Sequence, residues 1–232
     1  MNSHSSSTHC RKGLTMWQVE SIAEFLETAA RSASLHSMVL EPGAAQLEEV
    51  NGRLAGFYSS SGRGYLNSVE HHALDARLGV SQRSKIVTVR DRTGQLVSTV
   101  RLTPHPFESE GLVPPEADAG AFSGHFELSR LVSWYGGEFR TLPTALALGI
   151  ALLQARSMGA RGLVALARTP QRRVFAKFGL KPTHMSPLKV PIREDGDYWF
   201  LEAPIASVVD AAHAYTEQLQ STVPLLAPSS TF

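Results

Sequence analysis

The sequence predicts a mixed α/β domain whose central sheet is mostly antiparallel and flanked by helices, with additional helices at the N-terminal and C-terminal ends. Strand-like segments interleave with helix-like segments, and some neighbouring strands are joined by hairpin turns. The 232 residues, of which 43% are hydrophobic, can fill one sizeable core. We therefore expect a disordered leader over residues 1–15, a single domain over residues 16–222 and a flexible tail over residues 223–232.

The first half of the domain is expected to contain two helices and three strands. Apolar residues recur at helical spacing on both sides of the Pro42-Gly43 break, between residues 22 and 29 and between residues 47 and 57, with a short strand at 37–40. Strand-like segments at 85–90 and 95–102, joined by Asp91-Arg92-Thr93-Gly94, predict a hairpin. A loop over 103–124 follows, and loops of about this length are usually functional or mobile.

The second half alternates strands and helices. A strand is expected at 126–133 and a helix from Thr141 or Thr144, favoured by Pro143, to Gly159. A short strand at 162–167 leads to a helix that starts at Thr169-Pro170 and stops at Gly179. The remaining elements are a closing hairpin of 188–192 with 198–202 and an outer helix over 206–219.

Composition excludes several classes of protein. Lys+Arg 22 against Asp+Glu 21 leaves a formal charge of +1, so we expect neither nucleic acid nor a membrane surface as the main partner. The single cysteine, Cys10, rules out an internal disulfide framework. No apolar run reaches the roughly 20 residues of a spanning helix, and no secretory signal is recognisable. A cytoplasmic location is the default expectation.

Charges set into strand-like sequence are the most informative feature of the chain. Arg101 interrupts one apolar strand, and Glu127 and Arg130 interrupt another. Burying a charge is costly unless it is paired, so these residues indicate a lined pocket, although a buried Glu–Arg pair that only ties strands together is the alternative. Strand alternation puts Glu127 and Ser129 on one face and Arg130 on the other, so the charges can act together only if the strand is bulged.

The order of elements resembles that of the GCN5-related N-acyltransferase superfamily, with Val174–Pro182 similar to its late helix and terminating glycine. Within it, the chain is most similar to the acyl-homoserine-lactone (autoinducer) synthases and the long-chain N-acyl amino acid synthases. The matching positions are Arg53 and Phe57, Asp75, Arg101-Leu102 and the segment from Glu127 to Arg130. The resemblance covers roughly residues 37–202 and implies the fold of that superfamily, including a bulge in the Glu127 strand.

The resemblance has departures. The acidic and aromatic cluster of autoinducer synthases is replaced by the looser set Glu70, His71, His72 and Asp75, and the coenzyme A loop is replaced by Tyr135-Gly136-Gly137. A carrier-protein thioester therefore becomes as plausible a donor as acyl-CoA. The tyrosine of many acetyltransferases falls on Phe175, which has no proton to give. Adjacent histidines on a helix diverge, so we expect no metal site.

The implied function is an N-acyltransferase that moves a fatty acyl group from an acyl-carrier-protein or acyl-CoA thioester to the amine of an amino acid or S-adenosylmethionine, without a tightly bound cofactor. Glu127 would take the amine proton, while Arg101 and Arg130 hold a carboxylate or orient Glu127. The remaining candidates are Arg53, Phe57, Asp75 and Ser129 for the substrate, and Val132, Trp134, Arg140, Arg172 and Arg173 for the acyl donor.

Two other functions stay open at this point: a conventional acetyl-CoA-dependent N-acetyltransferase, and a catalytically silent domain that binds an acyl ligand or a partner. The late helix adds a basic set that suits an acidic carrier protein or coenzyme A phosphates, unless it is only a solvated helix face. This set consists of Arg168, Arg172, Arg173, Lys177 and Lys181.

Overall fold

The computed structural model describes residues 7–112, 122–136, 141–184, 186–190, 193 and 196–222. Its centre is a seven-stranded sheet in the order β1-β2-β3-β4-β5-β7-β6. Neighbouring strands are antiparallel except for β4 and β5, which are parallel. The predicted mixed, mostly antiparallel sheet is therefore confirmed. The strands are β1 (His36–Leu40), β2 (Lys85–Arg90), β3 (Leu96–Pro104), β4 (His125–Ser133), β5 (Gly162–Arg168), β6 (Lys181–Pro182) and β7 (Tyr198–Pro204).

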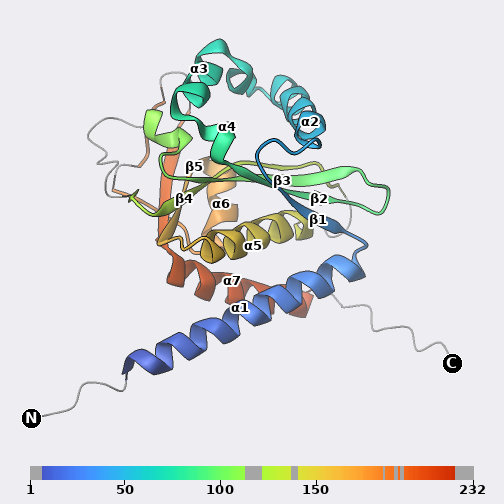
Figure 1. The fold of residues 1–232 in the computed structure, drawn as a ribbon, viewed down its shortest axis with the longest axis vertical. Helices are drawn as coiled ribbons and strands as arrows, with labels where there is room; N and C mark the ends of the chain where they lie inside the picture. Colours follow the sequence, from blue (N-terminus) through green and yellow to red (C-terminus); the bar gives the residue numbers. More distant parts are fainter. Residues whose placement is uncertain are drawn as a thin grey trace, which may run out of the picture.

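Helices cover both faces of the sheet (Figure 1). One face carries four helices: α1 (Ser7–Ser32), α5 (Leu142–Ser157), α6 (Thr169–Ala176) and α7 (Ile205–Thr222). The other face carries shorter elements: α2 (Leu47–Ser60), α3 (Val69–Leu78), α4 (Val80–Arg83) and the 3-10 turns η1 (Gly64–Asn67) and η2 (Glu108–Gly111). In the described part of the chain, no helix is long and apolar enough to cross a membrane.

The main apolar core lies on the α5 face. Helix α5 is buried nearly all round because the sheet covers one side and α1 and α7 cover the other, and Leu146, Leu148 and Leu152 are each at most 1% exposed. The residues expected to form the first helical stripe, such as Ile22 and Phe25, pack into this same core. Smaller apolar clusters lie under α2 and α3 on the opposite face.

The sheet is split between β4 and β5. The two strands pair only at His125–Gly162, Phe126–Leu163 and Glu127–Val164. Both strands are described beyond these pairs, to Ser133 and to Arg168, so the split begins directly after Glu127.

Strand β4 also contains a bulge. Ser129 is opposite Arg101 and Val132 is opposite Thr99, so Arg130 and Leu131 share the single position of Val100. Arg130 has a φ of 51°, in the left-handed region that non-glycine residues seldom adopt. The bulge that the resemblance implied is confirmed.

Three sequence expectations need comment. The closing hairpin was wrong in its first strand: β7 pairs with β6 at Lys181–Pro182, while Leu188 forms only an isolated bridge to Tyr198. A strand at 188–192 could not be distinguished from loop by composition, and residues 191 and 192 lie outside the described ones. Helices α3 and α4 were not predicted. Helix α1 begins at Ser7, whereas the leader was expected to extend to residue 15. The expected boundaries of the domain, at residues 16 and 222, stay predictions.

Candidate active site

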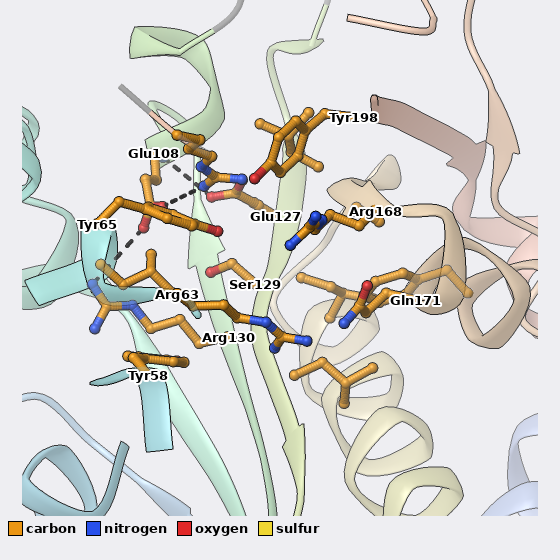
Figure 2. A pocket seen from close by; sticks show the side chains of 17 residues that line it. Tyr58, Arg63, Tyr65, Glu108, Glu127, Ser129, Arg130, Arg168, Gln171 and Tyr198 are labelled. Carbon is orange, nitrogen blue, oxygen red and sulfur yellow. Dashed lines mark hydrogen bonds and ion pairs between the residues drawn. The ribbon is translucent and has the colours of Figure 1, made fainter. Parts of the chain in front are cut away.

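A cleft opens where β4 and β5 separate. Figure 2 shows Glu127 and Ser129 of β4 on one wall, and Arg168 and Gln171 on the opposite wall formed by β5 and α6. Elements of the α2 face close its other sides. The lining residues are Tyr58, Arg63, Tyr65, Leu66, Glu108, Glu127, Leu128, Ser129, Arg130, Leu131, Leu166, Ala167, Arg168, Gln171, Phe175, Arg193 and Tyr198.

Glu108, in η2, is the centre of a buried ionic cluster beside this cleft. Its Oε2 accepts a hydrogen bond from Arg101 Nη2, and its Oε1 accepts one from Arg193 Nη2 at 3.0 Å. Arg130 Nη2 lies 3.9 Å from Oε2. Burial alone would raise the pKa of Glu108, but the positive charges of Arg101, Arg130 and Arg193 lower it by more than burial raises it. The pKa of Glu108 therefore lies well below its ordinary value. Glu108 is therefore ionised and holds three guanidinium groups together.

Glu127 is equally buried but differs in its protonation. Its Oε2 accepts a hydrogen bond from the backbone N–H of Glu108 at 3.1 Å. Burial first, and then the carboxylate of Glu108, raise the pKa of Glu127 to about 7, against the lowering effect of Arg101. A carboxyl group with this pKa can exchange a proton with a substrate at neutral pH.

The bulge brings Arg130 into the same cluster. Arg130 Nη2 donates to His71 Nε2 at 3.1 Å, and because arginine only donates, we assign the proton of His71 to Nδ1. Burial lowers the pKa of His71 to about 4, and Arg130 acts in the same direction against the opposing effect of Glu108. A neutral His71 does not offset the charge of Arg130.

Arg101 is held by three partners. Its Nε donates to Ser129 Oγ at 3.1 Å, its Nη1 donates to Asp75 Oδ1 at 3.2 Å, and its Nη2 donates to Glu108. The structure thus brings the predicted residues Arg101, Asp75 and Ser129 together with Glu127 and Arg130. Because all three nitrogens of Arg101 are engaged, the geometry favours its orienting role over direct binding of a substrate carboxylate.

Four other predicted residues lie outside the lining of the cleft. The guanidinium of Arg53 lies over the ring of Trp134, 5.2 Å from its centroid, and Phe57 packs edge-on against the same ring at 5.7 Å. Val132 is buried in the apolar cluster under α2. The sequence assigned Arg53 and Phe57 to one substrate and Val132 and Trp134 to the other, whereas the structure places all four together.

The remaining donor candidates are Arg140, Arg172 and Arg173, of which the last two belong to the predicted basic set of the late helix. Arg172, on α6, lies over the ring of Trp199 at 4.0 Å, and Arg173 is exposed. Neither lines the cleft, although Gln171, one residue earlier, does. Arg140 lies outside the described residues. The donor-binding roles of all three stay predictions.

Sequence reasoning missed several residues of the site. Glu108 is in the long loop that was noted only for its length, and no pattern marked it as buried. His71 was considered as a metal ligand and as part of the loose set with Glu70, His72 and Asp75, but not as a partner of Arg130, and Tyr198 was considered only as part of a strand. The residues missed in this way are Tyr58, Tyr65, His71, Glu108, Gln171, Arg193 and Tyr198.

The site offers a proton acceptor and several hydrogen-bond donors, but no metal centre. Among the described residues, no group of three or more His, Cys, Asp and Glu side chains could hold a metal ion. Glu127 can take a proton, and the guanidinium and phenol groups around it can bind hydrogen-bond acceptors.

Comparison with known proteins identifies the fold. No protein-family model matches the chain, and no curated protein matches its sequence. TofI in an apo form is similar with a TM-score of 0.52 at 20% identity, covering 76% of this chain and 95% of TofI.

Two further solved structures extend this likeness. BjaI, described as a CoA-dependent acyl-homoserine lactone synthase and solved with SAM and isopentyl-CoA, gives a TM-score of 0.54 at 14% identity, covering 78% of this chain and 90% of BjaI. A protein of Lactobacillus plantarum assigned as an N-acetyltransferase gives 0.50 at 15% identity, covering 74% and 99%. The chain has the GCN5-related N-acyltransferase fold, as its sequence predicted.

Proposed function

We propose that the protein is an N-acyltransferase that moves an acyl group from an acyl-CoA or acyl-carrier-protein thioester to the amine of a small acceptor. The observation that carries this proposal is the position of Glu127, a buried carboxyl group with a pKa of about 7, at the point where β4 and β5 separate. The acceptor is an amino acid or S-adenosylmethionine. The thioester is a co-substrate, and no tightly bound cofactor takes part.

Acyl transfer requires a neutral amine, because only its lone pair can attack the thioester carbonyl. The α-amino group of a free amino acid is mostly protonated at neutral pH, so a nearby base with a pKa near 7 can help to hold it in the neutral form. As the C–N bond forms and the C–S bond breaks, Glu127 takes the amine proton, directly or through a water. The sulfur leaves as a thiolate, which takes up a proton from Glu127 or from water to give the free thiol. The backbone N–H of Glu108 fixes the Glu127 carboxyl group at 3.1 Å.

The split sheet supports a place for the thioester arm. Beyond Glu127, β4 no longer pairs with β5. The backbone N–H and C=O groups on the β5 side of β4 are therefore available to bind the amide groups of a pantetheine arm. Leu128, Ser129 and Leu131 of β4 face Leu166 and Ala167 of β5 across the cleft. The shared fold of BjaI, which was solved with isopentyl-CoA, is consistent with a thioester in this position.

The direct test is release of free thiol, corrected for hydrolysis. The purified protein is given acyl donors of several chain lengths, on coenzyme A and on a carrier protein, with pooled amines, and the products are identified by mass spectrometry. Amine-dependent release with an acylated product is expected. Release with acetyl-CoA alone would indicate a conventional acetyltransferase, and no amine-dependent release with any donor would indicate a binding domain.

Replacing the base is the sharpest variant. Glu127→Gln should lower the turnover rate about 100-fold, the ordinary magnitude for a general base. Glu202→Gln is the matched control, because Glu202 lies on β7 outside the cleft lining. Near-normal turnover in Glu127→Gln would exclude the proposed role.

A measurement of the stability of Glu127→Gln distinguishes loss of the base from loss of the folded structure. The pKa of Glu127 in the folded protein, about 7, lies above its ordinary value of 4.5, so the unfolded chain releases this proton at lower pH than the folded chain. Ionisation of Glu127 therefore opposes folding as the pH rises from 4.5 to above 7. At pH 8, Glu127→Gln should be no less stable than the wild type in a thermal melt.

A further inference from the structure

Several buried polar atoms around the cleft have no hydrogen-bond partner within the described part of the protein. They include Tyr58 Oη, Arg130 Nε, Arg193 Nε and Tyr198 Oη. The side chains of Tyr58 and Tyr198 are 2% and 1% exposed, so these groups cannot be satisfied at the protein surface. All four can donate, and burial raises the pKa of Tyr58 to about 12, which keeps its phenol protonated. The cleft is therefore prepared for a ligand that accepts hydrogen bonds.

The charges of the buried cluster point the same way. Its three guanidinium groups, on Arg101, Arg130 and Arg193, form their ion pairs with only two carboxylates, on Glu108 and Asp75, in the described part of the chain.

Arg130 has the weakest compensation of the three guanidinium groups. Its closest partner is the neutral His71 at 3.1 Å, and Glu108 is 3.9 Å away, whereas Arg193 donates to Glu108 at 3.0 Å. Tyr58 lies in the electrostatic field of this same guanidinium, and both residues line the cleft. An anion bound by Arg130 and Tyr58 would give the Arg130 guanidinium the close negative partner that it lacks.

A second positive charge on the ligand would meet the arginines of the cleft. Ammonium and sulfonium groups are commonly bound on aromatic faces, but two of the four aromatic rings that line the cleft already carry an arginine. Arg193 lies 5.3 Å from the ring centroid of Tyr65 and 5.2 Å from that of Tyr198.

We propose that Arg130 and Tyr58 form a carboxylate-binding subsite, and that the acceptor is an amine with a free carboxylate and no further positive charge. This inference rests on the proposed function. It selects amino acids with neutral or acidic side chains over S-adenosylmethionine, whose sulfonium group adds a positive charge. The carboxylate bound at Arg130 would leave the amine of the same molecule to reach toward Glu127, which lines the same cleft.

The test compares acceptors that differ by one charge. The best of the twenty amino acids is found by mass spectrometry, and its kcat/KM is compared with that of its own amide and of S-adenosylmethionine. The amide keeps the amine and the side chain and loses only the carboxylate. A charge-assisted hydrogen bond corresponds to about 10- to 100-fold, so the kcat/KM of the free acid should exceed that of its amide by at least about tenfold. It should also exceed that of S-adenosylmethionine, which keeps the carboxylate but adds the sulfonium charge.

Each outcome has a separate meaning. Equal rates for acid and amide, or a higher kcat/KM for S-adenosylmethionine than for the best amino acid, would overturn the subsite while leaving the transferase intact. No amine-dependent thiol release with any acceptor would instead overturn the proposed function itself.

Tyr58→Phe tests whether the preference for the free acid over its amide comes from this subsite. The substitution removes one oxygen, so it should raise the KM for the free acid by about tenfold while the KM for the amide and kcat change little. The acid-to-amide ratio is the decisive readout, because a general loss of structure would lower both rates together. Tyr215→Phe removes a phenol oxygen on α7, outside the cleft lining, and should leave the ratio unchanged. An unaltered ratio in Tyr58→Phe would overturn the assignment.

Discussion

The two faces of the sheet differ in the kind of side chain that they bury. On the α5 face, long helices bury aliphatic side chains, and Leu146 has no exposed surface. On the α2 face, short helices and the turn η2 enclose Glu108, Glu127 and Arg101, each 2% exposed. Apolar burial stabilises wherever it occurs, but buried charges stabilise only as a complete set. The comparison teaches that the stability of one face is spread over many apolar contacts, while that of the other depends on one central carboxylate, Glu108, which pairs with three arginines.

Removing the central charge should have the largest effect. Glu108→Gln leaves three buried guanidinium groups with less compensation, and breaking a buried ion pair costs about 3–5 kcal/mol of unfolding free energy. Chemical denaturation at pH 7 measures this loss. Glu110→Gln makes the same change two residues away, where the carboxylate accepts a hydrogen bond from the backbone N–H of Phe107 at 3.0 Å and lies 3.3 Å from His105 but meets no arginine in the described part of the chain, and it should cost clearly less. Equal losses in the two variants would mean that the cluster has no special weight.

The pH dependence of this loss has a definite sign. The pKa of Glu108 in the folded protein lies below its ordinary value of 4.5, so its contribution is complete above pH 4.5 and is lost as the pH falls below it. The difference between wild type and Glu108→Gln should therefore shrink in acid. Because the Glu108 carboxylate also raises the pKa of Glu127, the acid limb of the kcat profile should move to lower pH in this variant.

A deletion in the apolar face should come next in size. Leu146→Ala removes a fully buried side chain from α5 and should lower the free energy of unfolding by about 2–5 kcal/mol. Its kcat per folded molecule and its pH profile should stay as in the wild type, in contrast to Glu108→Gln. Met158→Ala, at the exposed end of the same helix, is the control. A shifted pH profile in Leu146→Ala would show that the two faces are not independent.

The smallest effect is expected outside both faces, at the basic residues of α6. Arg173 is exposed, so Arg173→Ala should change stability by no more than about 0.5 kcal/mol. If α6 docks an acidic carrier protein, the KM for a carrier-bound thioester should rise a few-fold in the variant, and the wild-type KM should rise with salt. Lys189→Ala, an exposed cation on another segment, is the control. A KM that changes neither with salt nor in Arg173→Ala would indicate that α6 is an ordinary solvated helix.

The sequence allowed the apolar face to be predicted almost completely. Spacing at residues such as Ile22 and Leu146 depends on local helical geometry, so it can be recognised without knowing the partners. The charged face could be predicted only in part, through Arg101, Glu127 and Arg130, whose placement in apolar strands is unusual.

Residues on loops and short helices gave no comparable signal. Glu108 is buried where three arginines meet it, Arg101 from the preceding strand and Arg130 and Arg193 from segments farther along the chain, and such a meeting depends on tertiary structure. His71 lies in α3, which has weak apolar periodicity and was not predicted. The bulge at Arg130 came from the resemblance, because strand alternation alone would have sent its side chain to the other face.

One small residue controls how the two halves of the sheet meet. Only three residue pairs join β4 to β5, and Gly162 is in the first of them. A methyl group at Gly162 would collide with the ring of His125 and would lie 2.7 Å from the carbonyl oxygen of Ala203. The absence of a side chain at Gly162 therefore lets β4 and β5 lie close together just before they separate, and a larger residue would push them apart there. The proposed acyl-donor site would then change its width although none of the residues that line the cleft had been replaced.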